Sequence, residues 1–145
     1  MEAKGLMIGD WVRHFNGTPM QVTRIDYTQS GGHFACGTPH CWEYNNKFES
    51  IPLTSELLEE NGFERVPQPG CSNPYYWKLK QRDEDGELLY RIEAYNTPFR
   101  GMFIQINNPS DCASISFCKQ IEHVHELQHA LRLCDIDTEI AIKED

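Results

Sequence analysis

The stretch YYWKLKQRDEDGELLYRIEAY, Tyr75 to Tyr95, decides the fold class of this chain. Two runs rich in aromatic and aliphatic residues flank Arg82–Gly86, and the dipeptide Asp85-Gly86 favours a tight hairpin turn. The second run alternates as expected for a strand that is covered on one side. One face carries Leu88, Tyr90, Ile92 and Ala94, and the other carries Leu89, Arg91, Glu93 and Tyr95. The stretch therefore predicts an antiparallel hairpin.

Downstream of the hairpin, GMFIQI (101–106) and SISFC (114–118) predict two further strands. A helix is expected from about Lys119 to Leu133, because its apolar residues recur at helical spacing. They are Ile121, Val124, Leu127, Ala130, Leu131 and Cys134. Residues 75–145 are thus predicted to form an antiparallel meander packed by a C-terminal helix.

Upstream of the hairpin, short strands separated by turns at Asn16-Gly17 and Gly31-Gly32 predict a small SH3-like, barrel-like β module. A two-turn helix follows, with Thr54 as its N-cap and Gly62 as its end signal. Residues 1–65 form this predicted module. Residues 66–74, VPQPGCSNP, contain three prolines and a glycine and are the predicted linker. The fold class expected for the whole chain is α+β.

The charge and the hydrophobic pattern of the chain argue against two classes of partner, nucleic acids and membranes. The 145 residues carry a net charge of −9, and the basic residues form no stripe that could follow a phosphate backbone, so a nucleic-acid partner is not expected. The N-terminus MEAKGLMIGDWV lacks the apolar core of a signal peptide, and no run is long enough for a membrane span. We therefore expect a cytoplasmic protein with reduced cysteines, in which Cys118 and Cys134 pack as small apolar residues.

The sequence HELQH matches the zinc-peptidase pattern His-Glu-x-x-His. His125 and His129 lie one helical turn apart and could share a zinc ion, while Glu126 could act as the base that deprotonates a zinc-bound water. Asp135 is a candidate third ligand, but the position where such sites have a turn-forming glycine is Arg132, and a third ligand from upstream also remains open. The competing interpretation is the polar side of an ordinary amphipathic helix. This side holds Glu122, His125, Glu126, His129 and Arg132.

A second group of possible metal ligands lies in HFACGTPHCWE, which contains His33, Cys36, His40 and Cys41. The spacing lacks a Cys-x-x-Cys knuckle, and Cys71 would complete a set only through favourable folding. We interpret the segment as a loop with incidental ligand types. A metal site, or a disulfide between Cys36 and Cys41 in oxidised preparations, remains the alternative. Motifs for nucleotide binding or for an activated serine are not found in the sequence.

Three short pieces resemble small uncharacterised proteins of gut bacteria and their phages or integrated mobile elements. They are IGDWV (8–12), IPLTSELLEENGF (51–63) and VHELQHAL (124–131). The resemblance covers about the first 65 residues and the final helix. Its recurrent helix pattern, Val-His-x-Leu-Gln, maps onto Val124, His125, Leu127 and Gln128 and includes neither Glu126 nor His129. The resemblance therefore implies that the HELQH match is incidental, and it implies no activity.

Together these features predict a non-enzymatic accessory or adaptor protein that acts through protein contacts and needs no cofactor. A small zinc-dependent peptidase that uses His125, Glu126 and His129, with zinc as its cofactor, is the alternative. The aromatic residues are expected mainly in the core, and any that stay exposed would form a protein-binding surface. They are Trp11, Phe15, Trp42, Tyr44, Tyr75, Tyr76 and Trp77. The partner and the oligomeric state are not encoded in any recognisable signal.

Overall fold

The computed structural model describes residues 1–29, 31–36, 47–67, 76–82, 84–85, 88–97, 101–108, 113–116, 120–136 and 139–143. They form two compact units, each with an antiparallel sheet, which agrees with the predicted α+β class. Unit 1 comprises Met1–Pro52, His123–His129 and Glu139–Asp145, and unit 2 comprises Leu53–Glu122 and Ala130–Thr138. The short helix that we assigned to the first module thus falls in unit 2. Most of the predicted linker, residues 68–74, lies outside the described residues.

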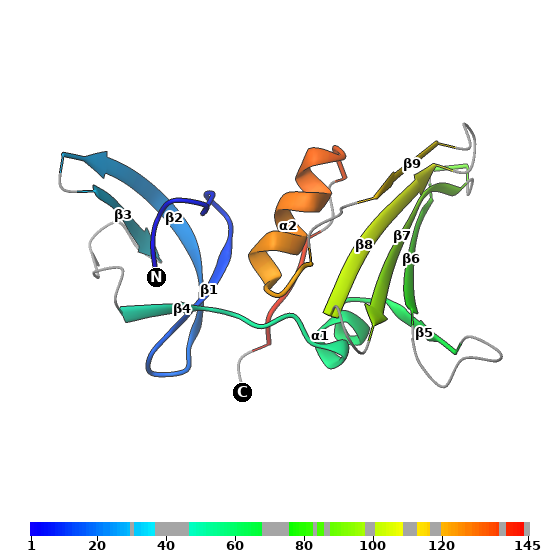
Figure 1. Cartoon of the computed structure of the whole chain (residues 1–145), viewed down its shortest axis with the longest axis horizontal. Helices are drawn as coiled ribbons and strands as arrows, with labels where there is room; N and C mark the ends of the chain where they lie inside the picture. The colour runs from blue at the N-terminus through cyan, green and yellow to red at the C-terminus, as the bar shows by residue number, and fades with distance from the viewer. Residues whose placement is uncertain are drawn as a thin grey trace. The chain divides into compact units, whose positions relative to one another are not determined.

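Unit 1 contains a four-stranded sheet in the order β3-β2-β1-β4 (Figure 1). The strands are β1 (Trp11–His14), β2 (Pro19–Thr28), β3 (Gly31–Cys36) and β4 (Phe48–Ser50). Asn16-Gly17 forms the predicted turn: Gly17 has φ +94° and its N–H donates to the His14 carbonyl over 2.8 Å. Among the described strands the sheet does not close into a barrel, so the SH3-like arrangement is not confirmed. The core of the unit contains Ala3, Leu6, Val12, Val22, Phe34, Cys36 and Phe48.

The second predicted turn of unit 1, at Gly31-Gly32, comes slightly earlier in the chain than expected, because β2 ends at Thr28 and β3 already begins at Gly31. Both glycines belong to β3, where Gly32 pairs with Tyr27 of β2. A Cβ at position 32 would lie 2.9 Å from Tyr27 Cε1 and 3.0 Å from Ala3 Cβ. Glycine therefore serves here to let a ring and a neighbouring segment approach the strand closely.

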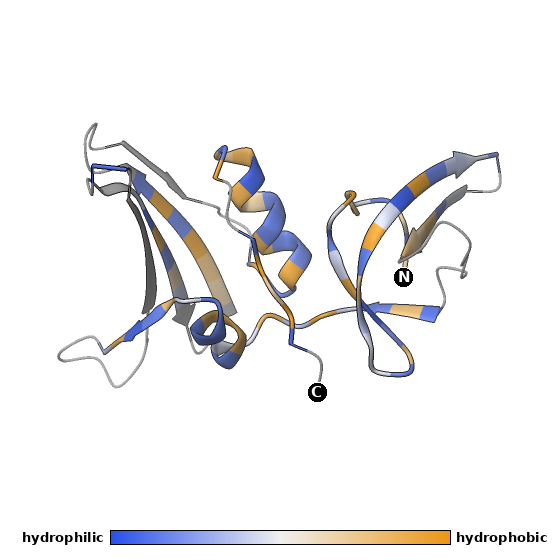
Figure 2. Ribbon diagram, turned by 180° about the vertical axis from the view of Figure 1, so that it is seen from behind, coloured by the Kyte–Doolittle hydropathy of each residue, from blue (hydrophilic) through white to orange (hydrophobic). Residues whose placement is uncertain are grey.

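Unit 2 contains the predicted meander, with five antiparallel strands in sequential order (Figure 1). They are β5 (Glu64–Val66), β6 (Tyr76–Arg82), β7 (Leu88–Thr97), β8 (Gly101–Asn108) and β9 (Ala113–Ser116). Strand β5 has only three residues and was not predicted, and Gly86 of the predicted hairpin turn lies outside the described residues. Figure 2 shows alternating polar and apolar residues along β8, whose apolar residues Met102, Ile104 and Ile106 are buried.

Strand β7 has buried residues on both faces, although only one face was expected to be buried. Ile92 and Ala94 are fully buried, as the alternation predicts. On the other face, Glu93 is only 6% exposed and accepts a hydrogen bond from the Tyr95 hydroxyl, while Arg91 Nη1 lies 3.6 Å from its carboxylate. A network of side chains thus shields a carboxylate on the face that was expected to be solvated.

The first helix, α1 (Ser55–Glu60), begins and ends as predicted. The Thr54 hydroxyl oxygen accepts the N–H of Leu57 over 3.2 Å, and Gly62 follows the helix with φ +83°. The left-handed φ explains why a glycine stands there.

The second helix, α2 (Val124–Leu133), starts five residues later than Lys119, the predicted start. The preceding segment is extended because its backbone is engaged elsewhere: Ile121 N–H donates to Met102 O over 2.8 Å, and Leu53 N–H donates to Glu122 O over 2.8 Å. The prediction of which helix residues are apolar and buried is correct for all but one of them. Ile121, Val124, Leu127, Ala130 and Leu131 are buried, whereas Cys134 is only partly buried.

Candidate functional site

The HELQH segment lies at the start of α2, where the N-terminal half of the helix belongs to unit 1. The rings of His125 and His129 have centroids 5.8 Å apart, as expected for residues one helical turn apart. His123 stacks on His125 with centroids 5.6 Å apart and an interplanar angle of 15°. Three imidazoles therefore form one row in unit 1.

A carboxylate from the other end of the sequence joins this row. Asp10 immediately precedes β1 and is fully buried, and its Oδ2 lies 2.6 Å from Nε2 of His129. The same oxygen accepts the N–H of Met7 over 2.7 Å. Sequence reasoning left an upstream partner open but did not name Asp10. The available signal was a carboxylate between apolar neighbours in IGDWV, because buried carboxylates need partners.

Gln128 lies between the two histidines of HELQH and is also buried. It contacts the segment of residues 9–11, which includes Asp10. Its Nε2 donates to Gly9 O over 3.0 Å, and its Oε1 accepts the N–H of Trp11 over 3.0 Å. Trp11 in turn donates from Nε1 to the carbonyl of Ile140 over 2.6 Å. These bonds fasten the 9–11 segment to α2 and to the C-terminal segment within unit 1.

Glu126 has the position of the catalytic base in the zinc-peptidase pattern. In the structure its carboxylate contacts His123 at the start of α2. Its carboxylate accepts the backbone N–H of His123 over 3.1 Å and lies 3.6 Å from His123 Nδ1. Reaching back to the N–H at the helix start is what the glutamate of a capping box does. The geometry therefore gives Glu126 a structural task.

His125 is the least supported imidazole of the row. Its Nδ1 is buried without a hydrogen-bond partner. Burial lowers the pKa of His125, and the charges of Asp10 and Glu126 oppose this shift, while His129 and His123 add to it. The neutral form of His125 is therefore favoured.

The predicted zinc ligands are only partly brought together. His125 and His129 are neighbours, whereas Asp135 follows the end of α2 at Leu133. The helix continues through Arg132 without reversing, and Asp135 is exposed with φ 55°. Among the described residues, no group of three or more His, Cys, Asp or Glu side chains is arranged to hold a metal ion.

The second predicted ligand group is described only in part. His33 and Cys36 lie on β3, where Cys36 is buried in the core of unit 1. His40, Cys41, Cys71 and Cys118 lie outside the described residues. Burial raises the pKa of the Cys134 thiol, which favours its unreactive protonated form.

Comparison with known proteins found no matching family model, no matching curated protein and no matching solved structure. In the part of the chain that the structure describes, no helix is long and apolar enough to cross a membrane. The functional argument therefore rests on the geometry of the chain itself.

Proposed function

We propose that this chain is a non-enzymatic accessory or adaptor protein of phage-like or mobile-element origin, which acts in the cytoplasm by binding other proteins. The observation that carries the proposal is a pair of adjacent exposed apolar residues in unit 1. Met7 is 46% exposed and Ile8 is 65% exposed. Adjacent apolar side chains that stay at the surface of a folded unit are candidate anchors for a protein interface.

The backbone that presents this pair is held firmly. The N–H of Met7 donates to the buried Asp10 carboxylate, the N–H of Asp10 donates to Met7 O over 3.1 Å, and the N–H of Gly9 donates to Val22 O over 2.7 Å. A turn that is fixed before binding loses little conformational entropy in a complex. Met7 and Ile8 therefore form a preorganised anchor, which we call the Met7–Ile8 turn.

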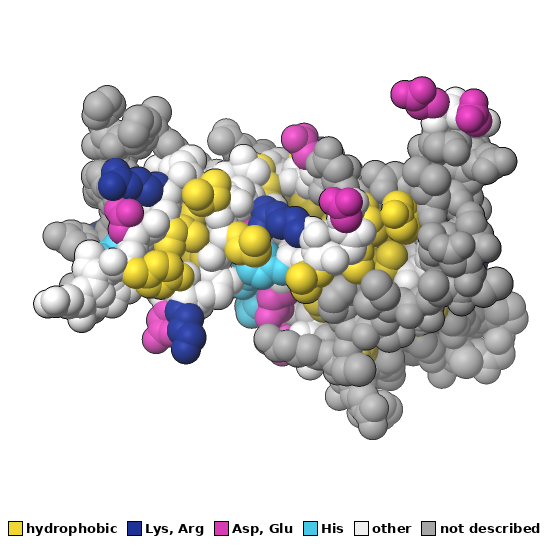
Figure 3. Space-filling view, turned by 90° about the horizontal axis from the view of Figure 1, so that it is seen from above, with side chains coloured by type: hydrophobic (Ala, Val, Ile, Leu, Met, Phe, Trp, Pro, Cys, Tyr) yellow, Lys and Arg dark blue, Asp and Glu magenta, His cyan; other side chains and the backbone are white. Residues whose placement is uncertain are grey.

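Other exposed apolar residues of unit 1 extend the possible contact area. Phe15 is 63% exposed and Tyr27 is 67% exposed. Figure 3 shows hydrophobic side chains reaching the surface at several places on the face it displays. Exposed aromatic residues of this kind are common in interfaces.

The HELQH residues support the non-enzymatic part of the proposal. His129 binds the Asp10 carboxylate that also holds the Met7–Ile8 turn, and Glu126 binds the backbone at the start of α2. Both residues have a structural explanation that requires no metal ion.

Site-specific photo-crosslinking in lysate of the source organism tests the proposal. A photoreactive residue replaces Ile8, and the matched control carries it at Glu49, an exposed position on β4. We expect a discrete adduct only from position 8, and we expect wild-type protein to compete with it better than the variant Met7→Ser/Ile8→Ser. Identical adduct patterns from both positions, or none from position 8, would contradict the proposal.

A small zinc peptidase is the second candidate function, supported by the closeness of His125, His129 and the Asp10 carboxylate. The zinc content of reduced, untagged protein separates the two candidates. We expect no stoichiometric zinc. About one zinc per chain that is lost in His129→Ala would overturn the first proposal and would justify a proteolysis screen with Glu126→Gln as the control.

A further inference from the structure

We propose that the Asn16-Gly17 turn is a modification site, at which the side-chain amide of Asn16 is lost to water and an aspartate or isoaspartate forms. The sequence contains two Asn-Gly dipeptides, Asn16-Gly17 in unit 1 and Asn61-Gly62 in unit 2. A glycine has no side chain to shield its backbone nitrogen, so this nitrogen can reach the amide of a preceding asparagine. The hydrogen bonds of the structure distinguish the two dipeptides and favour the first. The site shares no residue with the Met7–Ile8 turn, so the inference goes beyond the proposed function.

The reaction needs only water and a base from the solvent. The backbone nitrogen of Gly17 gives its proton to the base and bonds to Cγ of Asn16, which places a negative charge on Oδ1. The Cγ–Nδ2 bond then breaks, and the amide nitrogen leaves as ammonia after taking a proton from water. Water opens the resulting cyclic imide at either of its carbonyl carbons. The net change exchanges the amide for the carboxylate of an aspartate or an isoaspartate.

The hydrogen bonds of Asn16 prepare its side chain for this attack. Oδ1 of Asn16 accepts the N–H of Thr18 over 3.0 Å. Because the partner is a backbone donor, the accepting atom is the amide oxygen and not the amide nitrogen. The same N–H stabilises the charge that develops on Oδ1 when the nitrogen of Gly17 bonds to Cγ. Among the described residues, Nδ2 of Asn16, the atom that must leave, has no hydrogen-bond partner.

Solvent reaches both residues of this turn. Asn16 and Gly17 are exposed, and a Cβ built on Gly17 would meet nothing within 4 Å beyond its chain neighbours. The base and the water therefore meet no covering side chain. The N–H of Gly17 donates to His14 O over 2.8 Å, so this bond must open before the nitrogen can attack. The opening is local, because the bond closes only the turn between β1 and β2.

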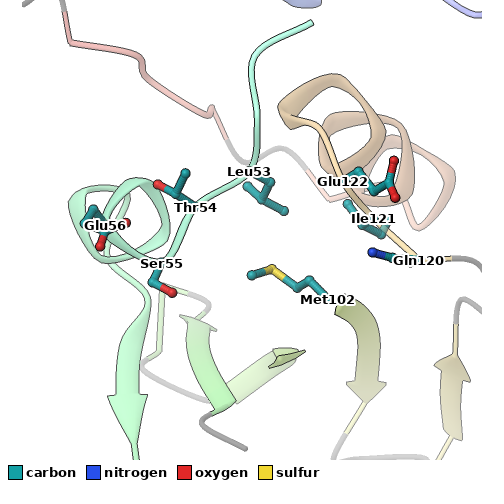
Figure 4. A pocket seen from close by; sticks show the side chains of 8 residues that line it. All are labelled: Leu53, Thr54, Ser55, Glu56, Met102, Gln120, Ile121 and Glu122. Carbon is teal, nitrogen blue, oxygen red and sulfur yellow. The ribbon is translucent and has the colours of Figure 1, made fainter. Parts of the chain in front are cut away.

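Asn61-Gly62 provides the comparison within the same chain. It ends α1, whose first turn Figure 4 shows beside a hollow in unit 2. Nδ2 of Asn61 donates to Leu57 O over 2.9 Å, so the atom that must leave is already bound. The N–H of Gly62 donates to Glu59 O over 3.0 Å. A backbone bond must therefore open at both dipeptides, but only Asn61 must also give up a bond of its leaving group.

An isoaspartate at position 16 changes the hairpin, because it routes the main chain through the side chain and lengthens it by a methylene group. The turn sets the register of β1 and β2, in which Arg13 pairs with Pro19 and Val12 with Met20. The turn bond from Gly17 N–H to His14 O depends on the same chain length. The modified protein should therefore unfold at lower urea concentration than the unmodified protein.

The test follows both dipeptides in one sample. Full-length protein is incubated in mildly alkaline buffer and then digested with trypsin, which cuts after lysine and arginine. The resulting peptides of residues 14–24 and 48–65 each contain a single asparagine, Asn16 and Asn61 respectively. Mass spectrometry measures the exchange of the amide NH2 for OH, and fragment ions assign it to the asparagine. A sample digested before the incubation corrects for changes during digestion, and a parallel incubation in urea measures the unfolded chain.

We expect Asn16 in the folded protein to lose its amide at least about fivefold faster than Asn61, which is the effect of one hydrogen bond of ordinary strength. In urea the two rates should agree within about twofold, because unfolding releases both dipeptides from their bonds. Asn16→Gln is the matched variant, since its longer side chain forms the cyclic imide much more slowly. It should show no product at position 16 and an unchanged rate at Asn61.

Three results would overturn the proposal. The first is an equal or faster loss of the amide at Asn61 in the folded protein. The second is an Asn16 amide that survives in the folded protein but is lost in urea, because the turn would then protect the residue. The third is a fivefold difference that persists in urea, which would assign the selection to neighbouring sequence. None of them bears on the Met7–Ile8 turn, whose proposal is tested separately.

Discussion

At the scale of single residues, Asp10 holds together a large part of unit 1. It is fully buried, and its carboxylate binds the Met7 N–H and the His129 imidazole. Burying a carboxylate costs solvation free energy. Hydrogen bonds from polar groups or from positively charged groups offset that cost. Removing one member of such a pair leaves the other without compensation.

We expect Asp10→Ala to lower the free energy of unfolding by about 3 kcal/mol, because it removes a fully buried carboxylate that binds two partly buried donors. Urea denaturation measures the change. Asp26→Ala is the matched control, since Asp26 forms only an exposed ion pair with Arg24, and its effect should stay below about 1 kcal/mol. The effects of Asp10→Ala and His129→Ala on the free energy of unfolding should be non-additive in the double variant. Strictly additive effects would contradict a direct interaction between the two residues.

His125 makes stability depend on pH. Its pKa is lowered in the folded chain, so below the ordinary value of 6.5 the unfolded chain binds more protons at this residue than the folded chain does. The free energy of unfolding therefore decreases as the pH falls through and below 6.5. We expect a smaller decrease in His125→Gln, which cannot titrate.

Urea denaturation of both proteins at about pH 7.5 and about pH 5.5 checks this prediction, because the difference between their slopes isolates the residue at position 125. The wild-type protein should lose more stability on acidification than the variant. Equal losses in the two proteins would show that His125 is not the group responsible.

At the scale of elements, α1 shows how a short helix depends on its ends. It has six residues, and its first turn depends on the Thr54 side chain as N-cap. Helices of this length are unstable alone, so caps and tertiary packing decide whether they form. Leu58, which is fully buried, supplies the packing.

We expect Thr54→Ala to destabilise the protein by about 1 kcal/mol and Thr54→Asn to restore most of that loss, because asparagine is also a good N-cap. Thermal unfolding and hydrogen exchange of the α1 amides provide the measurement. If Thr54→Asn were as unstable as Thr54→Ala, the cap would not be the source of the stability.

At the scale of the whole molecule, unit 1 is discontinuous in sequence. Its sheet comes from the first 52 residues, but Asp10, Trp11 and Ile51 bind partners that lie far along the chain. Those partners are His129, Gln128, Ile140 and Val124. Bonds of this kind form only after long loops have closed.

We expect a fragment of residues 1–52 to be unfolded, because it lacks the partners of its buried polar groups. Adding a synthetic peptide of residues 120–143 should restore sheet structure, seen as dispersed amide signals in NMR spectra. Cooperative unfolding of the isolated fragment would contradict the prediction.

The sequence by itself determined the features that depend on neighbouring residues. The period-two alternation around Ile92, the Asn16-Gly17 turn and the Thr54 cap each arise from groups only a few residues apart, and the structure has all three. Local sterics and local hydrogen bonds fix these features, so a pattern in the sequence is enough to recognise them.

Tertiary structure decided the rest. The start of α2 depends on the bonds of residues 121–123 to distant segments, and the role of Gly32 depends on the ring of Tyr27 across the sheet. The candidate site itself pairs Asp10 with a histidine 119 residues away. Periodicity carries no information about such pairs, because they are set by which buried polar groups meet once the chain has closed on itself.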